Sequence, residues 1–245
     1  MPTPVLNISA YRFTTLDNLP ALRERLLNAA QARGLKGTVL LACEGINLVL
    51  AGAEHAVRGW LAALREDPRF AAIETKESFS AAVPFRRLNV KIKREIIRMD
   101  QPTVQPGAER APSVSATTLA RWLAQGHDDG GRPLLLLDTR NAFEVDAGAF
   151  EGALDLRLTK FSEFPAALQA RREELLGKTV VSYCTGGIRC EKAALLMREA
   201  GIEHVVQLDG GILKYFEQVP GALHWRGGCF VFDERVSLGT SLEAA

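Results

Sequence analysis

A proline-rich segment divides this chain into two parts with different hydrophobic patterns. Residues 100–113 carry three prolines and show no apolar periodicity, which is typical of a linker. A chain of 245 residues is long enough for two domains. We therefore expect a first domain over residues 1–99, a linker over 100–114, a second domain over 115–225 and a C-terminal tail over 226–245.

Strand and helix patterns alternate in the first part. We expect the following elements in order: a strand over 5–13, a helix ending at Gly34, a hairpin over 37–52, a helix over 53–65, and strands between 73 and 99. Asn18 is placed to cap the first helix and Pro20 to start it. Cys43 lies in the apolar hairpin and is expected to be a small core residue. The order β-α-β-β-α-β predicts a ferredoxin-like (acylphosphatase-like) α+β domain.

The second part contains short, continuous apolar runs. PLLLLD, TVVSYC and HVVQLDGG suit strands that are buried on both faces of a parallel sheet. Helical patterns lie between them, and Ser115 is placed to cap the first helix. This alternation predicts an α/β domain that binds ligands at the carboxyl ends of its strands.

Composition excludes several classes of protein. The 30 basic and 29 acidic residues nearly cancel, and no apolar stretch approaches the roughly 18–20 residues of a membrane-spanning helix. The N-terminus lacks the pattern of a secretory signal, so we expect a cytoplasmic protein that does not bind membranes. The four cysteines, 43, 184, 190 and 229, show no disulfide framework spacing and are expected to stay reduced.

One short segment is strongly basic. RRLNVKIKREIIR, residues 86–98, holds six basic residues and one acidic residue, a net charge of +5. The candidates for contacts with a polyanion are Arg86, Arg87, Lys91, Lys93 and Arg94. The alternative is a strand with one solvated basic face.

The strongest chemical signal is YCTGGIRCEKA, residues 183–193. Cys184 lies where a buried strand ends and a helix begins, and two glycines let backbone N–H groups turn toward one point. These donors and the helix end stabilise a thiolate, so the pKa of Cys184 should lie below its ordinary value of about 8.5. Arg189 adds a positive charge. The loop is therefore a candidate nucleophile with its own anion site.

The number of residues between Cys184 and Arg189 limits the reactions that this loop can be expected to catalyse. Cysteine phosphatases use C-x5-R, whereas Cys184 and Arg189 enclose four residues and Cys190 takes the C-x5-R position. The smaller ring favours a small group on sulfur over a phosphate. Cys190 could resolve an oxidised Cys184 or simply pack, and Cys229 is expected to be structural.

Three segments of the second part resemble the rhodanese domain. CTGGIRC resembles its active-site loop, LDGGILKYF its late turn at Gly210–Gly211, and DTRNAFE its D-x-R-x3-E segment. The resemblance implies a loop that binds substrate or anions through Thr185, Gly186, Gly187, Ile188 and Cys190. It also implies a supporting ion-pair network of Asp138, Arg140 and Glu144 beneath the loop. The usual Gly-His pair is Gly148-Ala149 here, so a role for that histidine is absent.

The resemblance extends over nearly the whole chain. EGIN (residues 44–47), CTGGIRCEKA and FVFDER together resemble the bacterial rhodanese-domain family of tRNA uridine-34 hydroxylases. This implies oxygen-dependent formation of 5-hydroxyuridine at the wobble base, with tRNA as partner and an unidentified electron donor. Glu44 and Asn47 then either shape the hairpin or take an interdomain or substrate role, and Lys192 joins the candidate RNA contacts. The chain ends at Ala245 without the Cys-rich extension of some members, so we expect the short form.

The residues leave the reaction route open. Cys184 could attack uracil C6, or it could carry a persulfide as a reductant or sulfur donor. A rhodanese-type sulfurtransferase or persulfide carrier is therefore the alternative function, and a non-catalytic RNA-binding module is a second. The four histidines show no metal-ligand spacing, and no G-x-G-x-x-G follows a strand, so no metal or cofactor is identified. The oligomeric state stays open.

Overall fold

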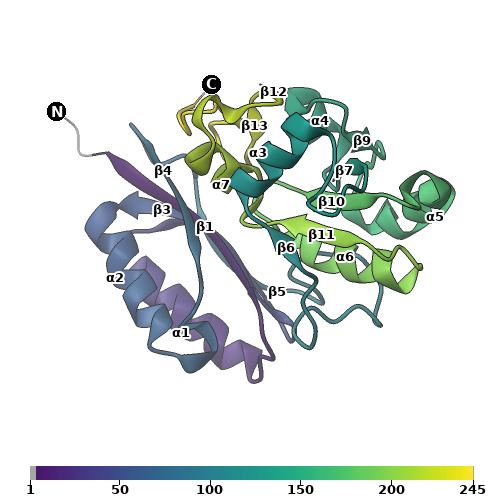
Figure 1. Ribbon diagram of the computed structural model, residues 1–245. Helices are drawn as coiled ribbons and strands as arrows, with labels where there is room; N and C mark the ends of the chain where they lie inside the picture. Colours follow the sequence, from purple (N-terminus) through teal and green to yellow (C-terminus); the bar gives the residue numbers. More distant parts are fainter. Residues whose placement is uncertain (1–3, 245) are drawn as a thin grey trace. The chain divides into compact units, whose positions relative to one another are not determined.

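The computed structural model describes residues 4–244, which form two compact units (Figure 1). The first unit contains the chain up to Arg98 together with Phe232–Arg235, and the second contains Met99–Val231 with Val236–Glu243. Each unit has its own hydrophobic core. No helix between residues 4 and 244 has the length and hydrophobicity needed to cross a bilayer.

The first unit is a five-stranded sheet covered by two helices. Its elements are β1 (Val5–Phe13), α1 (Leu19–Gln31), β2 (Lys36–Ala42), β3 (Gly45–Ala53), α2 (Glu54–Arg65), the 3-10 turn η1 (Pro68–Phe70), β4 (Thr75–Ser80) and β5 (Leu88–Ile92). The sheet order is β4-β1-β3-β2-β5, with β5 parallel to β2 and the other pairs antiparallel. The predicted ferredoxin-like order is confirmed, and β5 extends the sheet at the edge opposite β4.

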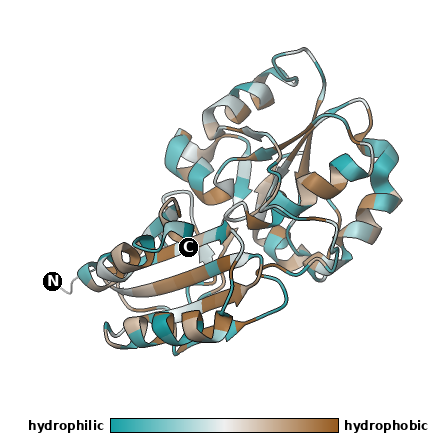
Figure 2. Cartoon of the chain, turned by 90° about the horizontal axis from the view of Figure 1, so that it is seen from below, coloured by the Kyte–Doolittle hydropathy of each residue, from teal (hydrophilic) through white to brown (hydrophobic). Residues whose placement is uncertain are grey.

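The spacing of apolar residues in the strands and helices explains how this unit packs. Leu6, Ile8 and Ala10 alternate along β1 and are buried, which places one face of the strand in the core. Helix α1 buries Leu22 and Leu26, one turn apart, and α2 buries its own apolar stripe in the same core. Apolar residues accordingly run along the strands of this sheet (Figure 2).

Two local expectations in the first unit are wrong. Asn18 precedes α1 in a left-handed conformation, and its side chain makes no capping hydrogen bond. Cys43 is exposed because it forms, with Glu44, the two-residue turn between β2 and β3. A residue at the tip of a hairpin lies beyond the sheet core, whatever the hydrophobicity of the strands beside it.

The second unit is built on a parallel sheet in the order β6-β11-β10-β7-β9. Its strands are β6 (Ser113–Val114), β7 (Leu134–Asp138), β9 (Leu154–Asp155), β10 (Thr179–Tyr183) and β11 (Val205–Leu208). Its helical segments are α3 (Ala116–Gln125), α4 (Ala142–Ala147), η2 (Phe161–Glu163), α5 (Phe164–Leu175), α6 (Ile188–Glu199), α7 (Gly211–Gln218) and η3 (Pro220–Ala222). Helix α3 contacts α7 and α5 contacts α6, which gives the α/β architecture of Figure 1.

The segments flanking this α/β core are attached to it. Ser113–Val114, at the end of the expected linker, forms β6, and Arg110 donates to Glu191 of α6 at 3.0 Å. On the C-terminal side, β12 (Trp225–Gly227) pairs with β8 (Gly148–Phe150), and β13 (Cys229–Phe230) pairs with β14 (Ser237–Leu238). The expected linker and tail thus contribute strands to the second unit.

Candidate active site

Cys184 directly follows β10, the central strand of the parallel sheet. Every residue of β10 is buried, and the chain turns at Gly187, whose φ of +101° precedes the first turn of α6. The N–H of Gly187 donates to Cys184 Sγ at 3.1 Å, and the Arg189 N–H and the Cys190 thiol also hydrogen-bond to that sulfur. The loop therefore surrounds the sulfur with donors.

Helix α7 explains why the loop amides face the sulfur. The N–H of Ile212 donates to the Cys184 carbonyl at 3.0 Å, and that of Leu213 donates to the Thr185 carbonyl at 3.1 Å. These bonds hold two loop carbonyls toward the first turn of α7. Gly211 has a φ of +68°, and a Cβ there would lie 2.5 Å from the Cys184 carbonyl oxygen. Only glycine allows this close approach.

Cys184 is ionised near neutral pH. Burial raises its pKa, but hydrogen bonds from Cys190 and from the Arg189 and Gly187 amides, together with the Arg189 charge, outweigh burial and lower the pKa to about 5. Burial and the neighbouring Cys184 raise the pKa of Cys190 well above its ordinary value. The pair is therefore one thiolate and one thiol.

The sulfur is buried in polar surroundings. The relative exposure of Cys184 is 0%, whereas Thr185, Gly186 and Ile188 are partly exposed. The loop rim thus reaches solvent, and the thiolate lies beneath it. A substrate atom can reach this sulfur only when some of the covering atoms move.

Arg189 is neutralised by a buried carboxylate. Both terminal nitrogens donate to Glu144 of α4, at 2.6 and 2.7 Å, and the guanidinium also interacts with the Cys184 sulfur. Arg189 and Glu144 are 5% and 0% exposed. Because the arginine charge is already paired, the loop lacks the free cation that a phosphate site needs.

Asp138 and Arg140 form a second buried ion pair. Arg140 donates to Asp138 at 2.6 Å and to the Gly148 carbonyl at 2.7 Å, and both side chains of the pair are fully buried. Its guanidinium also lies over the rings of Tyr183 and Trp225. The predicted network therefore consists of two separate ion pairs. Asp138–Arg140 holds the chain on either side of α4, and Glu144–Arg189 joins α4 to the cysteine loop.

Two further thiols lie at the loop. Cys190 contacts Thr139 Oγ1 at 3.7 Å. Cys229, far along the chain, lies beside Thr185 and donates to the Phe230 carbonyl at 3.8 Å, and burial raises its pKa to about 12. No local motif links Cys229 to the loop, and only the pairing of the C-terminal strands brings it there.

Glu44 and Asn47 hold the chain that follows β5. Glu44 accepts a hydrogen bond from the Ile96 N–H at 2.7 Å, and Asn47 donates to the Ile96 carbonyl at 3.1 Å. Ile96 is buried. The two residues therefore clamp both backbone polar groups of Ile96 within the first unit.

The expected RNA contacts divide into exposed and buried residues. Arg86, Arg87, Lys91, Lys93 and Arg94 are exposed, and Arg86 also pairs with Glu234 at 2.7 Å. Lys192 is 1% exposed, so its assignment as a surface phosphate contact is wrong. Residues 189–192 of α6 are all buried, which the helical pattern alone does not reveal.

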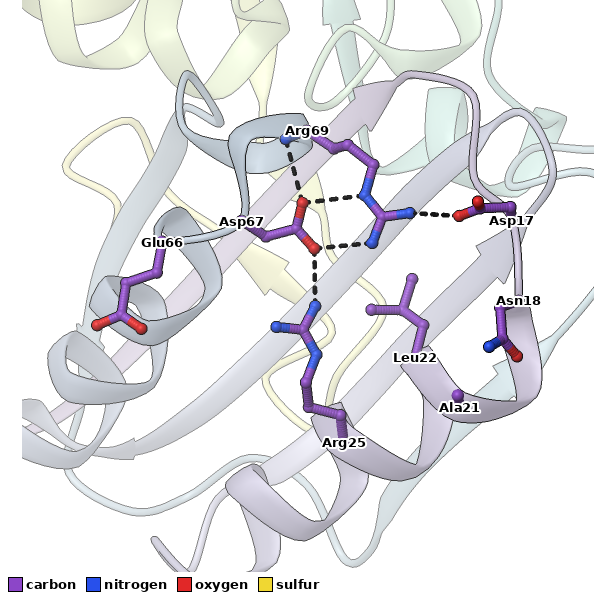
Figure 3. A pocket seen from close by; sticks show the side chains of 8 residues that line it. All are labelled: Asp17, Asn18, Ala21, Leu22, Arg25, Glu66, Asp67 and Arg69. Carbon is purple, nitrogen blue, oxygen red and sulfur yellow. Dashed lines mark hydrogen bonds and ion pairs between the residues drawn. The ribbon is translucent and has the colours of Figure 1, made fainter.

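A pocket of about 520 Å³ lies in the first unit near the start of α1 (Figure 3). Its arginines are already paired: Arg69 bridges Asp67 and Asp17, each at 2.8 Å, and Arg25 bonds Asp67 at 2.8 Å. Bonds from Arg69 lower the pKa of Asp67 well below its usual range, and burial opposes this shift. The pocket therefore has no arginine available for an anion. Across residues 4–244, no group of three or more His, Cys, Asp or Glu side chains could hold a metal ion.

The two units match known domains. Residues 5–96 match the UPF0176 acylphosphatase like domain, and residues 118–218 match the Rhodanese-like domain. The fold and the cysteine loop thus define a rhodanese-domain protein with an acylphosphatase-like N-terminal domain. A solved Rhodanese-like domain from Anabaena sp. is 22% identical, covers 47% of this chain and 79% of that chain, and has a TM-score of 0.37.

Proteins that match nearly the whole length of this chain identify one family within this class. The chain is 66% identical over 240 residues to a tRNA uridine(34) hydroxylase of Variovorax paradoxus (strain S110), covering 98% of this chain and 91% of that protein. It is 64% identical over 241 residues to a tRNA uridine(34) hydroxylase of Bordetella petrii, covering 98% and 95%. The chain belongs to the tRNA uridine(34) hydroxylase family.

Proposed function

We propose that this protein hydroxylates C5 of the wobble uridine of tRNA, with molecular oxygen as the oxygen source and Cys184 as the reacting group. The observation that carries the proposal is the Cys184 thiolate, held by loop amides in a chain of this family. The cytoplasm, where tRNA is used, is the expected location.

A thiolate suits the chemistry of uracil. C6 of uracil is electrophilic, and addition of a thiolate there makes C5 nucleophilic. The ordinary form of Cys184 near neutral pH is the required nucleophile. Position 34 lies in a single-stranded loop, so the base can leave its stack at modest cost. In the proposed route Cys184 adds to C6, and C5 gains one atom of O2 while a two-electron donor reduces the other atom to water. C5 then loses its proton, and the thiolate leaves C6.

The basic segment supplies the proposed phosphate contacts. Lys91, Lys93 and Arg94 are exposed on and just after β5, an edge strand, and Arg87 precedes it. Exposed cations of this kind add affinity without reading sequence. In this proposal the second unit performs the chemistry and the first unit contributes affinity for tRNA.

Nucleoside mass spectrometry of bulk tRNA tests the function. Cells that lack the gene should lose 5-hydroxyuridine and its derivatives, the wild-type gene should restore them, and Cys184→Ala should not. Cys43→Ala, at the exposed hairpin turn, is the matched control and should restore them fully. Restoration by Cys184→Ala would contradict the proposal.

A trapping experiment separates attack on C6 from persulfide chemistry. A tRNA whose position 34 carries a uridine analogue blocked at C5 should form a covalent adduct with wild-type protein and none with Cys184→Ser. If no adduct forms under turnover conditions while unmodified tRNA is hydroxylated, Cys184 acts through a persulfide instead.

Sulfur transfer is the second candidate. The match of residues 118–218 to the Rhodanese-like domain favours it, because the amides around Cys184 would also stabilise a persulfide anion. Conversion of thiosulfate and cyanide to thiocyanate and sulfite measures this activity. Rapid turnover that depends on Cys184, without hydroxylation of tRNA, would favour sulfur transfer.

A further inference from the structure

We propose that Cys184 and Cys190 form the two-electron donor of the hydroxylation, closing a disulfide once per turnover. This inference rests on the proposed function and names its reductant. The two buried cysteines flank one loop, and Cys190 Sγ lies 3.7 Å from the Thr139 hydroxyl, which bonds the carbonyl of Tyr183, the residue before Cys184.

The hydrogen bonds identify Cys190 as the protonated partner. The Thr139 hydroxyl donates to the Tyr183 carbonyl at 2.9 Å, which uses its only hydrogen. In its 3.7 Å contact with Cys190 Sγ, the Thr139 oxygen is therefore the acceptor, and Cys190 carries the proton. Cys190 can turn this S–H to Thr139 or to the Cys184 thiolate. The pair thus holds a nucleophile and a proton-bearing thiol side by side.

The reaction balances with this pair. Replacing C5–H by C5–OH uses one atom of O2, and the other atom leaves as water, which requires two electrons and two protons. Oxidising two thiols to one disulfide releases two electrons and two protons. One proton comes from Cys190, and the other from solvent because Cys184 is already ionised. In sum, uridine, O2 and the dithiol give 5-hydroxyuridine, water and the disulfide.

The order of events follows from the roles of the two sulfurs. Cys184 is still bonded to C6 when O2 adds to C5, so Cys190 attacks the outer oxygen atom of the resulting C5 hydroperoxide. The O–O bond breaks, C5 keeps a hydroxyl group, and Cys190 becomes a sulfenic acid. Loss of the C5 proton then releases Cys184 from C6. A sulfenic acid condenses with a neighbouring thiol to a disulfide and water. The two sulfurs then join in a bond of about 2.05 Å. An external thiol must reopen this disulfide before the next turnover.

A single-turnover experiment tests the inference. The enzyme is reduced without oxygen, freed of reductant, and mixed with aerated buffer and unmodified tRNA. Wild type should form about one 5-hydroxyuridine per chain and stop, and peptide mass spectrometry should find a Cys184–Cys190 disulfide. Cys190→Ser keeps a hydrogen-bond donor beside Cys184 and should form less than about one tenth of this burst. Cys43→Ser should match wild type. The disulfide is read in wild-type protein, so the test does not depend on the folding of a variant.

The outcomes separate the inference from the proposed function. A full burst from Cys190→Ser, an unchanged thiol count after the burst, or a disulfide to Cys229 would each overturn the role of Cys190. If wild type forms no 5-hydroxyuridine even with dithiothreitol and cell extract, the proposed function fails, and this inference fails with it.

Discussion

Glu144 accepts hydrogen bonds from both terminal nitrogens of Arg189, and this buried ion pair joins α4 to the cysteine loop. Its two ends lie in different segments of the chain, and the pair holds Arg189, the second residue of α6, in place. Arg189 in turn supplies a backbone N–H and a charge to Cys184. Glu144 thus positions a residue that stabilises the Cys184 thiolate.

Glu144→Gln should destabilise the protein by about 3–5 kcal/mol, because it leaves the Arg189 charge buried without a counter-charge. Urea unfolding measures the change. Glu151→Gln is the matched control, since Glu151 pairs with Arg226 at 2.7 Å on the surface, and it should cost about 0–1 kcal/mol. Equal effects of the two variants would show that the buried pair adds nothing.

The Cys184 thiolate should titrate in the acid range. A lowered thiol pKa means that the ionised form persists above it, so the thiolate should be constant between about pH 6 and 8 and should protonate as the pH falls through about 5. Ultraviolet absorbance of the thiolate, as wild type minus Cys184→Ser, follows this step. A midpoint near 8.5 would show that the loop does not stabilise the anion.

Gly211→Ala should disrupt the cysteine loop. A Cβ at this position meets the Cys184 and Thr185 carbonyl oxygens at 2.5 and 2.8 Å, and the φ of +68° adds strain, so we expect a loss of at least about 2 kcal/mol. The control is Gly177→Ala, where φ is +70° but nothing lies within 4 Å, and the cost should be about 1 kcal/mol. The difference between the two variants isolates the close approach of α7. Thiolate absorbance should fall only in the Gly211 variant.

The part of this site that could be predicted from sequence is local. The strand that ends at Cys184, the glycine turn and the helix after it all lie within a few residues, so hydrophobic runs and turn chemistry predict them. The parallel and ferredoxin-like sheets follow from the same patterns. The resemblance to the rhodanese domain also identified Asp138, Arg140 and Glu144 as an ion-pair network.

Long-range contacts could not be predicted in this way. Only the fold brings Ile212 to the Cys184 carbonyl and Cys229 to Thr185. The exposure of Cys43 and of Lys192 was mispredicted for the same reason. The apolar pattern around Cys43 does not show that it lies at a hairpin tip, and the charge of Lys192 does not show that its helix turn is buried.

Glu44→Ala should destabilise the first unit by about 1–3 kcal/mol, since the buried Ile96 N–H loses its acceptor. Thermal or urea unfolding followed through Trp60, which lies in the core of this unit, reports the loss. Glu24→Ala, at an exposed carboxylate of α1, is the control and should have no measurable effect. An unchanged unfolding midpoint for Glu44→Ala would show that this hydrogen bond does not stabilise the first unit.

Reversing two charges of the basic segment should weaken binding to tRNA. Lys91→Glu with Lys93→Glu should lower affinity and reduce the slope of log affinity against log salt by about 1–2. Filter binding at several salt concentrations measures both quantities. Arg33→Glu, at an exposed cation after α1, is the control for net charge. A slope equal to that of wild type would place the RNA contacts on another surface.

Isotope incorporation tests the central role of Cys184 most directly. Purified protein, unmodified tRNA and a thiol reductant are incubated under oxygen-18 gas, and position 34 is analysed by mass spectrometry. We predict 5-hydroxyuridine that carries one oxygen-18 atom with wild type, and none above background with Cys184→Ser. Equal labelled product from Cys184→Ser would show that this thiolate does not take part in the reaction.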